Sequence, residues 1–323
     1  MSLFRFTFGF LLFGALSTTG WAEEKVLRSA HGASDSIDSK PDKKKGSKLS
    51  IPLSRSKDSS SSGSSGSTSS SSSSSGCLPA FKKPPADHPI ADQLASLRKK
   101  AAAGNASAQS TLGYYLSLGV GCQKDMAEAV QWYYKAASQG EVMAQLSLAL
   151  CYARGEGTDA DPAQAATWFH EAAKNGVSMA QLCLGNCYET GDGVPVDVKV
   201  AAQWFALAAK QGEPKAQTRL GICYQLGKGV EKNPEKAAHW FREAALRGDT
   251  CAMLNLGSCY QAGAGVKKDV TRAFVWWTLA LQNGEEAARN ELNALRKDMS
   301  PEQIKDAEKR LKTTRDPRAW AAQ

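Results

Sequence analysis

Between residues 142 and 177, apolar residues recur at helical spacing in two successive segments. In the first segment Ala144, Leu148, Cys151 and Tyr152 fall on one side of a helix. In the second, the buried face comprises Ala165, Trp168, Phe169 and Ala172. The pattern predicts two amphipathic helices, each burying one side, and we expect each Trp to fill the volume that the small residues leave.

Capping residues mark where these two helices end and begin. The first segment ends in Gly155-Glu-Gly157, and glycine readily adopts the positive φ that terminates a helix. The second starts at Asp161-Pro162-Ala-Gln164, which places Asp at the N-cap and Pro at the first helical position. Gly176 closes it. The local signals therefore agree with a helix-turn-helix unit.

The same unit recurs with a period of 36 residues. A tryptophan and a tyrosine column both keep this step, and we assign them structural roles: Trp132, Trp168, Trp204, Trp240 and Trp276, with Tyr152, Tyr188, Tyr224 and Tyr260. Self-similarity at a fixed period indicates a solenoid. The sequence predicts an all-α fold, an α/α solenoid of five repeats at residues 106–141, 142–177, 178–213, 214–249 and 250–285.

Helical segments flank the repeats. Residues 87–105 resemble the second helix of an incomplete leading unit. Residues 286–323 contain two further amphipathic segments and a tail, and the second segment opens with the capping pattern Ser300-Pro-Glu-Gln303. We expect capping helices at both ends, because a solenoid must cover its terminal apolar surfaces.

The N-terminal region has a different composition. Residues 1–22 combine Arg5, an apolar run of about 11 residues and small residues up to Ala22, as a secretory signal peptide does. We expect cleavage near Ala22 and export to the periplasm or the exterior, with an uncleaved anchor as the alternative. Residues 23–86 are polar and Ser-rich, with Ser59 to Ser75 holding only Ser, Gly and one Thr, and predict a disordered linker.

Charge does not favour a nucleic-acid partner. The 323-residue chain has a formal net charge of +8. About half of that excess lies in the linker, so the repeat region is only slightly basic. No segment after the signal peptide is apolar enough to span a membrane.

The repeating columns resemble the Sel1-like repeat family, relatives of tetratricopeptide repeats. The resemblance covers about residues 106 to 285 and implies an interaction scaffold. Within this group, the Helicobacter cysteine-rich proteins have paired cysteines within each repeat, and some are associated with penicillin binding and weak β-lactamase activity. The five second helices here carry no cysteine. Ser-x-x-Lys occurs only as Ser54–Lys57 and Ser96–Lys99, without the accompanying β-lactamase motifs.

The cysteines have a packing explanation. Cys151, Cys187, Cys223 and Cys259 form one column, and equivalent residues in adjacent repeats should lie about 8–10 Å apart, too far for a disulfide. We expect buried thiols, although export would permit disulfides, and Cys77 could pair with Cys122. Cys183 and Cys187 lack further ligands nearby, so we predict no metal and no cofactor.

A variable stripe on the first helices is the candidate binding surface. By resemblance to tetratricopeptide solenoids, first helices line the concave side where partners bind. The candidate residues are Thr111, Tyr114, Ser147, Leu150, Arg154, Asn186, Arg219, Ile222 and Asn255. We predict a monomeric, exported, non-enzymatic scaffold for a protein or peptide, with no nucleic-acid partner. The alternatives are a cell-wall-associated protein with weak penicillin-binding or β-lactamase activity and a secreted host-interaction factor. For the stripe itself, the alternative is variation at solvated positions without a binding role.

Overall fold

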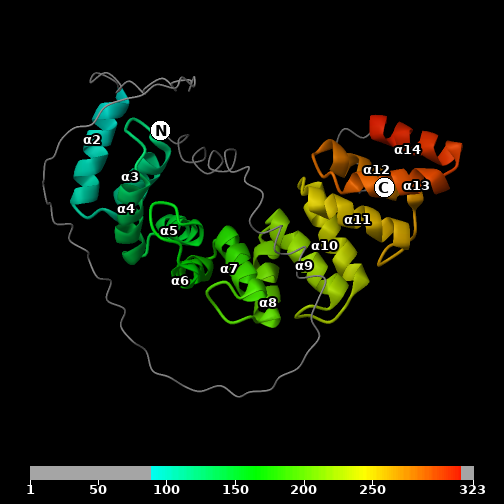
Figure 1. The fold of residues 1–323 in the computed structure, drawn as a ribbon, viewed down its shortest axis with the longest axis horizontal. Helices are drawn as coiled ribbons and strands as arrows, with labels where there is room; N and C mark the ends of the chain where they lie inside the picture. The colour runs from blue at the N-terminus through cyan, green and yellow to red at the C-terminus, as the bar shows by residue number, and fades with distance from the viewer. Residues whose placement is uncertain (1–88, 314–323) are drawn as a thin grey trace, which may run out of the picture. The chain divides into compact units, whose positions relative to one another are not determined.

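The computed structural model describes residues 89–313, which contain thirteen helices and no strand (Figure 1). The predicted signal peptide and linker (residues 1–86), which include Cys77 and Ser54–Lys57, and the predicted C-terminal tail after residue 313 lie outside the described residues. The leading helix is α2 (Pro89–Ala102). First helices are α3 (Ala106–Leu118), α5 (Val142–Arg154), α7 (Ser178–Thr190), α9 (Pro214–Leu226) and α11 (Thr250–Ala262). Second helices are α4 (Met126–Ser138), α6 (Pro162–Lys174), α8 (Val198–Lys210), α10 (Pro234–Leu246) and α12 (Val270–Gln282). The chain then adds α13 (Ala288–Asp298) and α14 (Pro301–Thr313).

Capping interactions set the helix ends as the sequence predicts. Gly155 has φ 68° in the left-handed region and donates its N–H to the Cys151 carbonyl. Asp161 accepts hydrogen bonds from the N–H groups of Ala163 and Gln164, both at 3.0 Å. All the other second helices also have an Asp or Asn N-cap that accepts from the backbone: Asp125, Asp197, Asn233 and Asp269.

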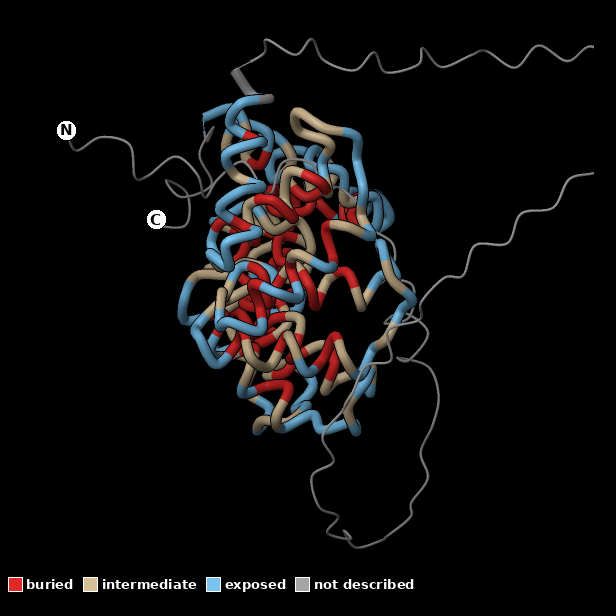
Figure 2. Tube along the Cα trace, turned by 90° about the vertical axis from the view of Figure 1, so that its left-hand side faces the viewer, coloured by how far each residue is buried: buried red, intermediate tan, exposed pale blue. Residues whose placement is uncertain are grey.

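Each helix from α3 to α12 packs on the helix before and after it, which builds the tandem α/α solenoid. Buried positions follow the inward sides of the helices and exposed positions the outward sides (Figure 2). The turn between paired helices touches the preceding repeat. At Gly193, φ is +77° and an added Cβ would overlap the Pro162 carbonyl. Glycine is therefore required there both for backbone conformation and for space.

Aromatic residues of two adjacent columns pack in the core, and the column after the tryptophans is the more deeply buried. The residue after each tryptophan is fully buried: Tyr133, Phe169, Phe205, Phe241 and Trp277. Trp276 is also buried, whereas Trp132, Trp168, Trp204 and Trp240 are only half-buried. The column after the tryptophans can be buried more deeply because a small residue on the neighbouring helix faces its ring. A Cβ on Gly185 of α7 would lie 2.5 Å from Cε1 of Phe205, so the missing side chain makes room for the ring.

A ladder of buried glutamines links successive repeats. Gln181 of α7 donates from Nε2 to the Ala173 carbonyl at the end of α6, at 3.2 Å. Its Oε1 accepts from Nε2 of Gln211, just after α8, at 2.8 Å. Gln109 and Gln145 make the equivalent pair of bonds, accepting from Gln139 and Asn175 respectively. Each glutamine thus joins three helices through one amide.

The flanking helices cover both ends of the solenoid. Leu94 and Ala101 of α2 are buried in the same cluster as α3 and α4. At the other end α13 and α14 both pack on α12, and Leu292, Leu295 and Ala307 join its apolar cluster. The predicted fold class, a repeat solenoid with flanking helices, is confirmed.

Candidate interaction surface

The nine stripe residues all lie on first helices, in α3, α5, α7, α9 and α11. Arg154 is exposed, and the other eight are half-buried. Leu150 and Ile222 also pack against the apolar clusters of the repeats. The structure therefore places the stripe at the boundary between core and solvent, where a side chain can take part in packing and still meet a ligand.

Polar contacts hold several of these side chains. Arg219 of α9 lies 3.9 Å from Oε2 of Glu189 on α7, and their side chains are 19% and 17% exposed. Arg154 lies 3.6 Å from the exposed Glu156. The hydroxyl of Thr111 and the side-chain amide of Asn255 donate back to their own helices. The Arg219–Glu189 pair thus ties adjacent first helices together.

Two acceptor atoms on α7 lack a hydrogen bond. Asn186 Oδ1 and Glu189 Oε2 are both enclosed and have no donor within hydrogen-bond geometry. A buried acceptor without a donor is destabilising, so such atoms favour a ligand or water that brings an N–H or O–H group. The middle of the stripe is therefore the part with unused hydrogen-bonding capacity.

Two carboxylates next to the stripe were missed by the sequence analysis. Glu213 and Asp249 are half-buried N-cap residues of α9 and α11. Burial raises the pKa of both carboxyls above their ordinary values. Asp249 accepts from the Thr218 hydroxyl at 2.9 Å and from the Ala252 N–H at 2.8 Å. The available signal was the 36-residue register, which also aligns Glu141 and Glu285 with them.

Comparison with known families decides what this array is. The Sel1 repeat model matches residues 106–141, 142–177, 178–213, 214–249 and 252–285, more than half of the chain. The chain belongs to the Sel1 repeat family. No curated protein matches it significantly.

Solved structures of similar proteins are also known. A Sel1 repeat protein from Oxalobacter formigenes is 32% identical, with a TM-score of 0.56, over 62% of this chain and 84% of that one. A protective antigen of uropathogenic Escherichia coli, with an SLR fold, is 30% identical with the same TM-score. That match covers 68% of this chain and 56% of the antigen. Helicobacter pylori cysteine rich protein B is 28% identical over 40% of this chain and 92% of that one, with a TM-score of 0.33.

The cysteines of these Sel1 repeats are thiols in the described residues. The column Cys151, Cys187, Cys223 and Cys259 is buried, as predicted. Burial raises the pKa of each of these thiols to about 11, and that of Cys183 to about 12. Nucleophilic attack requires a thiolate, so these residues are poorly suited to catalysis. Among residues 89–313 no cluster of three His, Cys, Asp or Glu side chains could hold a metal.

The tyrosines of the repeats lie near the C-terminal ends of the first helices, next to the turns that lead to the second helices. Tyr152, Tyr188 and Tyr224 are half-buried, and Tyr260 is buried. The Tyr152 carbonyl accepts from the Asp161 N–H at 2.9 Å, which closes the turn between α5 and α6. The backbone of Tyr188, Tyr224 and Tyr260 does the same in the following repeats.

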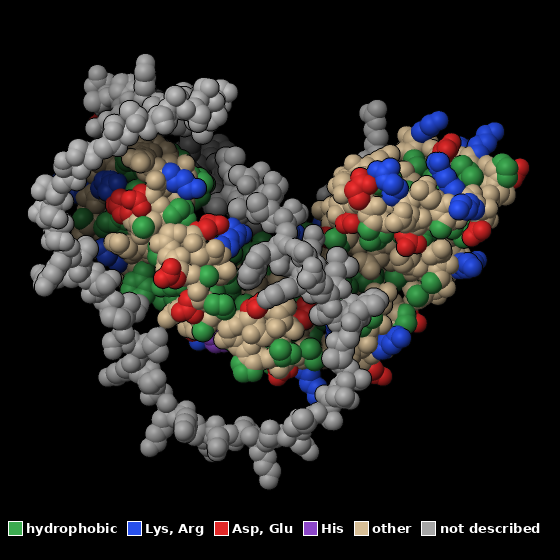
Figure 3. All heavy atoms as spheres, viewed as in Figure 1, with side chains coloured by type: hydrophobic (Ala, Val, Ile, Leu, Met, Phe, Trp, Pro, Cys, Tyr) green, Lys and Arg blue, Asp and Glu red, His purple; other side chains and the backbone are tan. Residues whose placement is uncertain are grey.

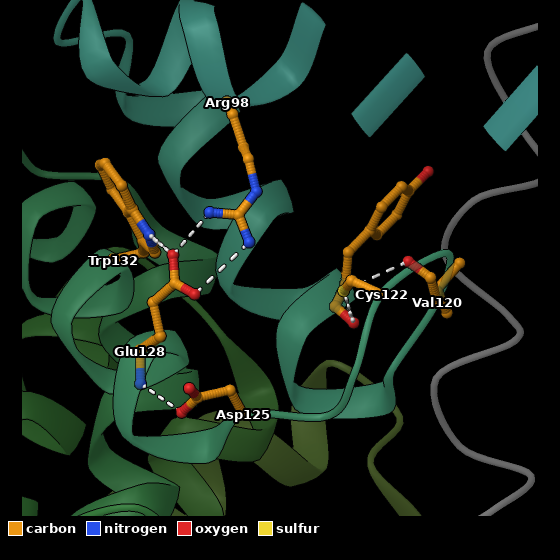
Figure 4. Close-up of polar contacts among 7 residues, drawn as sticks. Arg98, Val120, Cys122, Asp125, Glu128 and Trp132 are labelled. Atoms are coloured by element: carbon orange, nitrogen blue, oxygen red, sulfur yellow. Dashed lines mark hydrogen bonds and ion pairs between the residues drawn. The ribbon is translucent and has the colours of Figure 1, made fainter. Parts of the chain in front are cut away.

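A separate polar cluster fixes the leading helix on the first Sel1 repeat (Figure 4). Arg98 of α2 donates to both carboxylate oxygens of Glu128 on α4, at 2.8 and 3.4 Å, and Trp132 Nε1 donates to one of them at 3.1 Å. Burial raises the pKa of the Glu128 carboxyl, but these donors outweigh it, so the pKa lies below its ordinary value. Nearby Ser96 and Lys99 are exposed on α2. The cluster is an attachment point for α2.

Proposed function

We propose that this Sel1 repeat protein is an exported scaffold that holds a peptide or protein partner against the first-helix stripe. Residues 1–22 support export by their signal-peptide layout. No helix among residues 89–313 is long and apolar enough to cross a membrane. The partner would be held outside the cytoplasm, within reach of a solenoid carried on the Ser-rich segment.

The observation that carries the proposal is the unsatisfied middle of the stripe. Asn186 Oδ1 has no donor and Glu189 Oε2 has only its 3.9 Å ion pair with Arg219, while Leu150 and Ile222 offer half-buried apolar contacts on either side. A peptide can supply both hydrogen-bond donors and apolar contacts, because its backbone carries N–H groups and its side chains include apolar ones. On the face seen in Figure 3, acidic and basic side chains are interspersed.

The test is site-specific capture by the full chain. A variant with Arg154→Ser, Asn186→Ser, Arg219→Ser and Ile222→Ala is crosslinked in envelope extract beside the wild type, and bound proteins are identified by mass spectrometry. A matched control changes four exposed second-helix residues to serine: Thr167, Lys174, Lys199 and Gln203. Circular dichroism checks that both variants remain folded.

A partner recovered by the wild type and the control, and lost from the stripe variant, is the expected result. Recovery of the same partners by all three proteins would contradict the proposed face. Fractionation of cells expressing the full chain tests export independently, because retention in the cytoplasm without cleavage near Ala22 would contradict the localisation.

A further inference from the structure

The glutamine ladder has a gap at the fourth repeat. Gln217 is 2% exposed and donates from Nε2 to the Ala209 carbonyl at 3.1 Å, as its three counterparts do. Its Oε1, however, is enclosed and has no hydrogen-bond partner. In the third repeat the corresponding oxygen accepts from Gln211. The residue 36 positions after Gln211 is Arg247, so the carboxamide donor is missing here.

Arg247 does not replace the missing donor. Its Nη1 donates to the Glu243 carboxylate at 2.8 Å and to the Glu243 carbonyl at 2.9 Å. The guanidinium lies beside Gly212, where an added Cβ would be 3.4 Å from its Nε. Turning the Gln217 amide over would not help, because its oxygen would then face the Ala209 carbonyl, and two acceptors repel. The fourth repeat therefore leaves Gln217 Oε1 without a hydrogen-bond donor.

A depression opens at this same place. It has a volume of about 430 Å³ and lies between the end of α8 and the second half of α10, away from the stripe residues. Its lining includes Gln217, Lys210, His239, Trp240, Glu243 and Arg247. Arg247, with a side chain 40% exposed and held by Glu243, forms the part of the wall that a ligand would have to displace to reach Gln217 Oε1. A buried polar atom that needs a donor therefore lies at a pocket large enough for a side chain.

We infer that this pocket binds a carboxamide, such as the side chain of a glutamine or asparagine in a peptide. In three sister repeats a carboxamide donates to the equivalent glutamine oxygen, so the geometry of that place suits this group. The ligand NH₂ would donate to Gln217 Oε1, and its oxygen would accept from Arg247 or Lys210. Two cationic side chains against one carboxylate disfavour an ammonium ligand. Trp240 provides an apolar wall for the ligand's methylenes.

Saturation-transfer NMR with the full chain tests this inference. The probe is N-acetyl-glutamine methylamide, compared with N-acetyl-glutamate methylamide and with free L-glutamine. The first comparison tests the carboxamide, and the second distinguishes a peptide from a free amino acid as its source. Two variants copy the chain's own repeats: Arg247→Gln supplies the donor found at Gln211, and Gln217→Met copies Met253 of the fifth repeat.

The wild type should bind the glutamine probe about tenfold more tightly than the glutamate probe, the effect of roughly one well-placed hydrogen bond. Both variants should lose that preference, and Arg247→Gln should also raise Tm because it completes the ladder. Absence of binding to the wild type, or an unchanged preference in Arg247→Gln, would overturn the inference.

Discussion

The glutamine ladder allows a prediction in which two similar substitutions differ in their effect on stability. Gln181→Met removes two hydrogen bonds, from Gln181 to Ala173 and from Gln211 to Gln181. Gln217→Met removes only one, the bond to Ala209, and it also removes an acceptor that is buried without a partner. Methionine already occupies the same position at Met253, where it is 3% exposed, so the side chain fits the site.

The magnitudes follow from these counts of bonds. Each lost hydrogen bond costs about 1 kcal/mol net, while removal of an unsatisfied buried acceptor recovers roughly 1–3 kcal/mol. The gain from burying methionine is common to both variants and cancels in the comparison. We therefore expect Gln181→Met to reduce the free energy of unfolding by at least about 2 kcal/mol more than Gln217→Met, and Gln217→Met to be neutral or stabilising.

Urea unfolding followed by circular dichroism measures the difference. With a denaturant slope of roughly 2 kcal/mol/M, the two midpoints should differ by at least about 1 M. The slopes must agree between variants, because repeat arrays can lose cooperativity and then yield no single free energy. Equal destabilisation by the two substitutions would refute the reasoning, since the oxygen of Gln217 would then have a partner in solution.

Three further predictions concern the turns, the buried carboxylate and the thiols. In thermal unfolding, Gly193→Ala should lower Tm more than Gly176→Ala does. Both glycines have positive φ, but an added Cβ meets nothing within 4 Å at Gly176, whereas at Gly193 it overlaps the preceding repeat. Burial raises the pKa of the Asp249 carboxyl above its ordinary value of 3.8, so the stability that this group contributes is complete below pH 3.8 and is lost as the pH rises through the folded-state pKa. In a plot of the urea midpoint against pH, Asp249→Asn should remove this decrease, and a plot identical to that of the wild type would contradict the prediction. Iodoacetamide at pH 8 should modify Cys223, which is 3% exposed and whose pKa burial raises to about 11, on the order of a hundredfold more slowly in the folded protein than in urea, as peptide mass spectrometry can show; equal rates would mean that the thiol is not buried.

Much of the fold could be predicted because its signals are local and repeated. The capping residues, such as Asp161 and Gly155, act within a few residues of their own helix ends. The 36-residue period makes each signal visible five times, and so the helix pairs and the stacked architecture follow without knowledge of any distance. The stripe could be placed on the first helices for the same reason.

The rest depends on how the helices are turned toward one another. Trp204 and Phe205 are neighbours on one helix, but only the ring of Phe205 faces the space left by Gly185, so periodicity alone could not decide which aromatic fills the core. The gap at Gln217 likewise depends on Arg247, thirty residues later, turning toward Glu243. By itself the sequence determined the repeating helices and their order. Only the tertiary structure decided which side chains are satisfied, because hydrogen bonds between repeats require atoms that are distant in sequence to meet in space.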